Sequence, residues 1–272
     1  GISRNPSANL MKKALFTFAR RPNLHFVRDR LSNSLRVRDL ESVFTKRLEV
    51  EPSSLKAYFH NVEHHRAHMA SAFYVSPFDE AAILSVDGMG DFVSTMWGVG
   101  KGRRLEVDGS ISFPHSLGIF YSAVTQWLGF PKYGDEGKVM GLAPFGEPVF
   151  LDQMRGIVRL QRDGTFELDL DYFVHHAEGV TMSWDDAEPK LGILFSERFV
   201  REFGEPRVPG TEITKRHQDV AASLQAMLEE AELAMVRRLQ RESGQRALCM
   251  AGGVALNSAF NGKVLPETDF TD

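Results

Sequence analysis

The segment that decides the fold reads Ala81-Ala82-Ile83-Leu84-Ser85-Val86-Asp87-Gly88, six mostly apolar residues followed by an aspartate and a glycine. A short apolar run that stops at turn residues predicts a buried strand ending at Asp87-Gly88. Residues 93–99 and 105–111 follow closely, with glycines between them, and predict two further strands. Three short strands in succession indicate an antiparallel meander.

Downstream, the apolar spacing changes to that of helices. Residues 116–129 and the longer stretch 214–242 each carry one apolar stripe, and Gly244 stands where a helix-ending glycine is expected. Residues 145–212 contain several prolines and predict a loop-rich insertion or lid. A strand over 247–251, two glycines and a short helix over 254–260 complete an α/β pattern with a mixed sheet flanked by helices.

Upstream, residues 61–74 predict a helix with Asn61 as its N-cap, and Pro77 prevents its continuation. Residues 1–50 hold eleven Lys and Arg against four Asp and Glu, although the whole chain has a formal net charge of −4. A basic region can bind nucleic acid or phosphate. We favour amphipathic helices with solvated basic faces, because no nucleic-acid motif accompanies the charges. Nucleic acid is therefore an unlikely partner.

The composition is that of a globular protein, with 43% hydrophobic and 25% charged residues over 272 positions. The single cysteine, Cys249, excludes an intrachain disulfide and lies in an apolar strand, so we expect a core residue. No apolar run reaches the roughly 18–20 residues that span a bilayer. These features favour a cytoplasmic protein without a membrane partner.

Histidines give the strongest chemical signal. His64 and His68 are four apart on a predicted helix, so their rings share a face and can reach one ion, whereas His65 points elsewhere. Asp87, at the end of the first strand, can add a carboxylate, and Asp91 is a weaker candidate. Two histidines and a carboxylate suit a catalytic transition metal with open positions. The alternative is a surface histidine pair without an ion.

Two glycine-rich segments can hold an anion. In residues 133–141, Gly134, Glu136 and Gly137 surround Lys138, which can neutralise a phosphate; the alternative is a charged turn before a helix. The spacing is not that of a P-loop. Near the end of the chain, Gly252, Gly253 and Asn257 connect a strand to a helix. That arrangement can place a nucleotide against the backbone and the positive helix end, or can simply form a tight turn.

Three other histidines carry weaker expectations. His115 follows Pro114 at a helix start and is a weak candidate for a substrate contact. His175 and His176 lie in the loop-rich segment, where we expect them to be exposed to solvent.

Together these motifs resemble the O-carbamoyltransferases of natural-product and nodulation-factor biosynthesis, which include the cephem and tobramycin carbamoyltransferases. The resemblance covers residues 60–262 and rests on four segments in order: HHRAH (64–68) with SAF (71–73), VDG (86–88), GDEGKVMGLAP (134–144) and AGGVALN (251–257). The order, spacing and character of four segments make the match specific.

The resemblance implies a fold of the sugar-kinase, actin and chaperone-ATPase type, with two ribonuclease-H-like lobes. Residues 1–80 would be the end of the first lobe, and residues 81–272 most of the second. The chain would then be an internal piece of a longer enzyme, inactive by itself. A further aspartate that ligates the metal, and a C-terminal domain that makes carbamoyl adenylate from carbamoyl phosphate and ATP, would lie beyond it.

The resemblance also implies the site roles. His64, His68 and Asp87 would bind a divalent metal, Fe²⁺ in this family, and Asp87 and Lys138 would serve catalysis. The adenylate would lie beside Gly252 and Gly253. The acceptor would be a hydroxyl of a small molecule such as an antibiotic or a sugar. A rival within the same superfamily is a phosphotransferase or ATPase, but its Mg²⁺ would be held by carboxylates and water rather than histidines. A non-enzymatic binding module that uses the basic region is the second rival.

Overall fold

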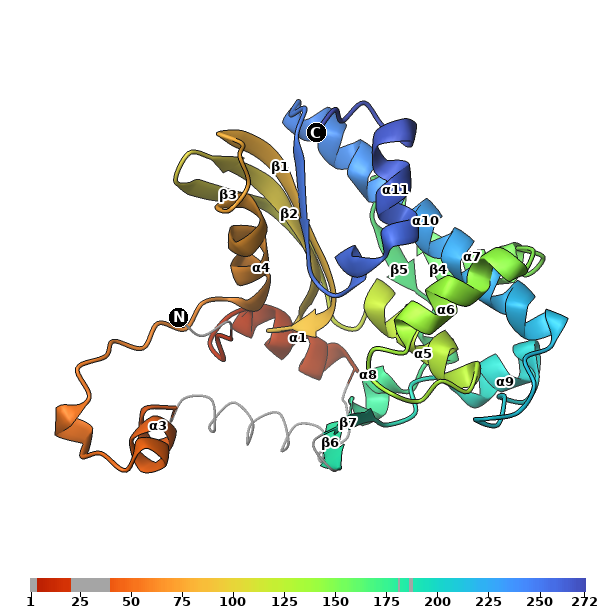
Figure 1. The fold of residues 1–272 in the computed structure, drawn as a ribbon, viewed down its shortest axis with the longest axis horizontal. Coiled ribbons are helices and arrows are strands. Elements are labelled where there is room, and N and C mark those ends of the chain that lie inside the picture. The colour runs from red at the N-terminus through yellow and green to blue at the C-terminus, as the bar shows by residue number, and fades with distance from the viewer. Residues whose placement is uncertain (1–3, 21–39, 181, 186–187) are drawn as a thin grey trace.

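The computed structural model describes residues 4–20, 40–180, 182–185 and 188–272 as an α/β protein built on a mixed four-stranded sheet. The sheet contains β1 (Glu80–Gly90), β2 (Val93–Lys101), β3 (Arg104–Ser112) and β8 (Leu248–Ala251). Their order is β3-β2-β1-β8, with β1, β2 and β3 antiparallel and β8 parallel to β1 (Figure 1). The predicted meander and mixed sheet are confirmed.

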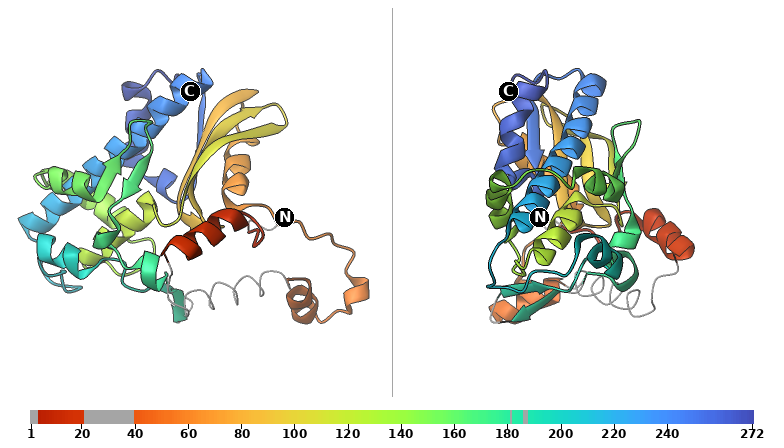
Figure 2. Two further views of the ribbon diagram at one scale, coloured as in Figure 1. Left: turned by 180° about the vertical axis from the view of Figure 1, so that it is seen from behind. Right: turned by 90° about the vertical axis from the view of Figure 1, so that its right-hand side faces the viewer.

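Residues 81–86 of strand β1 are nearly all apolar and are buried. Ala81 and Ile83 pack towards α4 (His64–Phe73), whereas Leu84 and Val86 belong to the core on the opposite face. That second core includes α5 (Leu117–Trp127) and α10 (Lys215–Ser243). Figures 1 and 2 show α4 and α10 on opposite sides of the sheet. A central strand covered on both faces is typically a continuous apolar run.

Three predicted boundaries are wrong. Strand β1 does not end at Asp87-Gly88; it continues to Gly90, and Asp91 and Phe92 form the turn with φ values of 49° and 75°. Helix α4 begins at His64 with Glu63, not Asn61, as its N-cap, because the Glu63 carboxylate accepts the Arg66 backbone N–H. The predicted helix over 254–260 is a 3₁₀ turn, Val254–Leu256, followed by α11 (Ser258–Glu267).

The segment 145–212, predicted as loop-rich, contains several short elements. They are α7 (Leu151–Ile157), β4 (Val158–Leu160), β5 (Phe166–Leu168), α8 (His175–Glu178), β6 (Met182–Asp185), β7 (Glu188–Leu191) and α9 (Glu197–Phe203). His175 is fully buried here, with its Nε2 2.8 Å from the Pro114 carbonyl oxygen, so its expected exposure is wrong. An apolar environment with one backbone acceptor suits a neutral imidazole, and burial lowers the pKa of His175 to about 4.

The remaining described elements lie outside the sheet. They are α1 (Leu10–Arg20), α3 (Leu40–Leu48), α6 (Glu136–Leu142) and the 3₁₀ turns Pro52–Ser54, Ala143–Phe145 and Leu170–Tyr172. Phe16 of α1 packs against Phe92 and Phe113, with ring centroids 5.6 Å and 4.8 Å away. No helix in the described ranges combines the length and apolar character that crossing a membrane requires.

The longest helix buries a carboxyl group without a described partner. Glu232 of α10 is fully buried, and neither of its side-chain oxygens has a hydrogen bond within the described structure. Burial, with a smaller contribution from the charge of Glu229, raises the pKa of Glu232 well above its usual value. The folded state therefore holds a proton that the unfolded state releases above its own pKa of about 4.3.

We predict that Glu232→Met stabilises the fold, because it removes two buried unpaired oxygens at similar volume. The free energy of unfolding should exceed that of the wild type by about 1–3 kcal/mol near pH 8, and the difference should shrink as pH falls towards 5. Urea unfolding at both pH values measures this. The exposed Glu205→Met is the control. An unchanged pH dependence in Glu232→Met would contradict the burial argument.

Candidate metal centre

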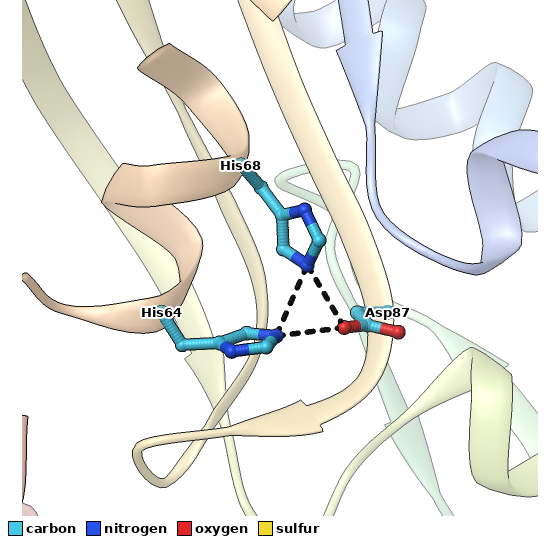
Figure 3. A group of neighbouring side chains, drawn as sticks. All are labelled: His64, His68 and Asp87. Carbon is cyan, nitrogen blue, oxygen red and sulfur yellow. Dashed lines mark hydrogen bonds and ion pairs between the residues drawn. The ribbon is translucent and has the colours of Figure 1, made fainter. Parts of the chain in front are cut away.

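Three predicted ligands meet at the end of β1. His64 and His68 project from α4, and Asp87 projects from β1 towards them (Figure 3). His64 Nε2 lies 2.9 Å from Asp87 Oδ2, His68 Nε2 lies 3.1 Å from the same oxygen, and the two Nε2 atoms are 3.0 Å apart. Their side chains are 20–30% exposed, so solvent or a ligand can reach the group.

Local structure explains this convergence. His64 and His68 are separated by about one turn of α4, so both rings lie on one face of the helix. The ladder between β1 and β2 is irregular between Val86 and Gly90, and Asp87 lies in this stretch. Irregular strands at functional sites redirect a side chain away from the regular alternation.

The two oxygens of Asp87 face different groups. Oδ2 faces the histidines, whereas Oδ1 accepts the backbone N–H of Gly88 at 2.7 Å and of Gly253 at 3.2 Å. Burial opposes the charge of this carboxylate, but the hydrogen bonds from His64, His68 and the two backbone amides hold its pKa well below the usual range. Asp87 is therefore an ionised carboxylate that offers one oxygen to the histidine side.

The donor group fits a metal ion in both chemistry and spacing. Ligand atoms bound to one ion with bonds of about 2.1 Å lie roughly 3.0–3.4 Å apart. The observed separations of 2.9–3.1 Å are short enough for the three atoms to contact one ion. Two histidines and one carboxylate on one face are typical of non-haem Fe²⁺ sites with open positions. Within the described residues, no other group of three His, Cys, Asp or Glu comes together in this way.

His65 has a different position, as its place on the helix predicted. Its ring is fully buried, with Nδ1 2.8 Å from Ser85 Oγ and Nε2 2.9 Å from the Val93 carbonyl oxygen. Burial lowers its pKa to about 4. A neutral His65 thus attaches α4 to β1 and β2 between the two candidate ligands.

The glycine pair after β8 lies directly beside Asp87. A Cβ on Gly252 would come within 2.2 Å of the Val86 carbonyl oxygen, and its φ of 98° also requires glycine. The backbone N–H of Gly253 donates a hydrogen bond to Asp87 Oδ1. Asn257 is buried and caps α11, accepting the Phe260 N–H at 3.0 Å. These contacts explain the motif structurally, and its nucleotide-binding role stays a prediction.

The second glycine-rich segment forms the start of α6. The Gly134 N–H donates to Glu136, and Lys138 Nζ lies 2.6 Å from Asp135 Oδ1, with its side chain 60% exposed. Gly137 has no atom near its missing Cβ position. Partial burial raises the pKa of Tyr133, with smaller contributions from the charges of Asp87 and Glu136. Lys138 is accessible to an anion, but its ion pair with Asp135 would have to rearrange.

The contact between Ser116 and the residues beside Asp87 could be predicted only in part from the sequence. Ser116 caps α5 through the Ile119 N–H, and its hydroxyl donates to the Gly88 carbonyl oxygen at 2.6 Å. A serine before an apolar helical run is a cap signature, but its contact beside Asp87 is long-range. His115 accepts the Leu168 N–H at 3.0 Å, and its role towards a substrate stays a prediction. Cys249 is buried, as predicted.

A two-histidine, one-carboxylate group at the end of a mixed sheet defines an α/β domain with a candidate metal centre. Comparison with known families then identifies the kind of protein. The model of the family described as carbamoyltransferase N-terminus matches residues 23–272, and the chain belongs to that family.

Individual relatives agree with this membership. An uncharacterized protein of Synechocystis sp. is 43% identical over 210 residues, covering 76% of this chain and 32% of its own length. Nodulation protein NolO of Bradyrhizobium diazoefficiens is 34% identical, covering 78% of this chain and 34% of its own. For nodulation protein NolNO of Sinorhizobium fredii the identity is 35%, and the shares are 82% and 29%. The chain thus spans about a third of the length of these curated relatives.

We predict that His65→Ala destabilises the protein by about 2–4 kcal/mol, because it leaves a cavity and removes the partner of buried Ser85. Urea unfolding at neutral pH measures the change. The exposed His60→Ala should stay within about 0.5 kcal/mol of the wild type. An equally small effect of His65→Ala would show that this ring does not hold α4 on the sheet.

Proposed function

We propose that this chain carries the metal-assisted transfer site of an O-carbamoyltransferase, which moves a carbamoyl group from carbamoyl adenylate to a small-molecule hydroxyl. The observation that carries the proposal is the donor group of His64, His68 and Asp87, in a chain of the carbamoyltransferase family. Family membership supports carbamoyl transfer in general. The hydroxyl acceptor, the adenylate donor and the metal are the finer parts of the proposal.

In the proposed reaction, the acceptor oxygen bonds to the carbamoyl carbon and its hydroxyl proton passes to solvent water. The bond between that carbon and the adenylate oxygen breaks, and AMP leaves with the electron pair. A divalent ion held by His64, His68 and Asp87, Fe²⁺ by the resemblance, would act as a Lewis acid on the carbamoyl oxygen or the acceptor hydroxyl.

The protein groups around the site have separate tasks. The backbone N–H groups of Gly88 and Gly253 keep Asp87 ionised and leave its Oδ2 directed at the histidines. Lys138 would supply positive charge to the adenylate phosphate once its ion pair with Asp135 rearranges. Because Gly253 connects Asp87 to the 3₁₀ turn after β8, a phosphate bound there would lie next to the reacting group.

We also propose that the sheet is part of a ribonuclease-H-like lobe. Three antiparallel strands followed by a parallel strand on the far side of β1 support this assignment. The last residues add to it, because Thr271 N–H donates to the Arg246 carbonyl oxygen and Leu248 N–H donates to the Asp272 carbonyl oxygen. These bonds run along the outer edge of β8, where a fifth strand of such a lobe would pair.

A magnesium-dependent phosphotransferase is less well supported by the same site. Mg²⁺ takes oxygen ligands and keeps several waters, whereas two of the three donors here are imidazole nitrogens. The basic region that would serve a nucleic-acid-binding module lies partly outside the described residues.

We predict that His64→Ala and His68→Ala each weaken Fe²⁺ binding by more than about 100-fold, because each removes a ligand atom. Removal of a group that only hydrogen-bonds to a ligand typically weakens metal binding by about 10–100-fold. Anaerobic titration followed by metal analysis measures it. His60→Ala is the matched control, since His60 is exposed and outside the donor group. Full occupancy in both ligand variants would remove the site assignment.

We predict that the 272-residue chain alone does not form carbamoyl adenylate. Incubation with ATP and carbamoyl phosphate should release no pyrophosphate above the rate without protein. The positive control is a full-length relative that contains the downstream region. Pyrophosphate release by the isolated chain would contradict the proposal that a separate downstream domain makes carbamoyl adenylate and this chain carries only the transfer site.

A further inference from the structure

Gly90, the last residue of β1, and Asp91, which follows it, both contact the candidate ligand His64. Asp91 Oδ2 accepts the backbone N–H of His64 at 3.0 Å and that of Asn5 at 2.6 Å. The preceding Gly90 lies against the His64 ring, because a Cβ at that position would be 2.0 Å from His64 Cδ2. The backbone of His64 is therefore bound by Asp91, and its imidazole lies against Gly90.

Asp91 meets a specific requirement of α4. His64 is the first residue of this helix, so its N–H has no carbonyl partner inside the helix. The cap residue Glu63 accepts the Arg66 N–H and does not serve His64. Asp91 supplies the missing acceptor, and its carboxylate also suits the positive end of the helix.

The turn that carries Asp91 is held in an uncommon conformation. Asp91 and Phe92 have φ values of 49° and 75°, which cost of order 1 kcal/mol or more for residues other than glycine. Asn9 Nδ2 donates to the Asp91 carbonyl oxygen at 3.0 Å, and the Phe92 ring packs against Phe16 and Phe113. These contacts maintain a backbone that directs the carboxylate to the start of α4.

We propose that Asp91 is a positioning residue of the metal centre: it fixes the N-terminus of α4 so that His64, lying on Gly90, directs Nε2 to the ion. This inference rests on the metal site of the proposed function. The sequence alone made Asp91 a weak ligand candidate. Here Oδ2 accepts two backbone amides, and Asp91 does not belong to the donor group of His64, His68 and Asp87, so Asp91 acts through His64 and not on the ion. His68 is one turn further along α4.

The test is Co²⁺ titration of the metal-free protein, followed by visible absorption. Asp91→Ala should weaken Co²⁺ binding by about 10–100-fold, the usual effect of losing a group that orients a ligand. Asp91→Asn keeps a side-chain oxygen for both N–H groups, so it should bind within about threefold of the wild type and give the wild-type spectrum. Asp79→Ala, at the other end of β1 and exposed, is the matched control.

A second variant keeps the test decisive if Asp91→Ala does not fold. Gly90→Ala leaves Asp91 in place but displaces the His64 ring, and it too should weaken Co²⁺ binding and alter the spectrum. Wild-type affinity and spectrum in Asp91→Ala or Gly90→Ala would overturn the inference. Loss of binding in folded Asp91→Asn as large as in His64→Ala would also overturn it, because the charge itself would then be required. Absence of Co²⁺ binding in the wild type would instead overturn the proposed metal site.

Discussion

The carboxylate of Asp87 joins the three elements on which the candidate site depends. One oxygen faces His64 and His68 of α4, and the other accepts the Gly253 N–H after β8. A partly buried carboxylate requires compensating hydrogen bonds, and here they come from both sides of β1. These hydrogen bonds together keep Asp87 ionised, direct its Oδ2 at the histidines and hold the glycine pair close to it.

The sheet makes this junction possible. Parallel pairing of β8 with β1 brings Ala251 beside Ser85, so the glycine pair follows at the level of Asp87. On the other side, buried His65 attaches α4 to β1 and β2, and Asp91 holds the first residue of the same helix. Helix α4 and the turn at Gly252 and Gly253 thus approach Asp87 from two directions. The donor group at the end of β1 stays partly exposed.

Local patterns predicted much of this arrangement. The helical spacing of His64 and His68 and the apolar run before Asp87 depend only on the periods of helix and strand, so the donor set was predictable from the sequence. The burial of His175 and the contact of Gly253 with Asp87 were not, because both depend on residues distant in the chain. The turn at Asp91 was also missed, since non-glycine residues rarely adopt positive φ and Asp87-Gly88 is the stronger turn signal. The family follows from four separated motifs together, whereas each motif alone has an ordinary structural explanation.

The central claim is that Asp87 and the two histidines hold one transition-metal ion. Anomalous diffraction at the iron absorption edge, from crystals grown with Fe²⁺ without oxygen, tests it most directly. We predict a single strong peak bounded by His64 Nε2, His68 Nε2 and Asp87 Oδ2. An iron peak elsewhere, or a well-ordered donor group with no peak, would contradict it.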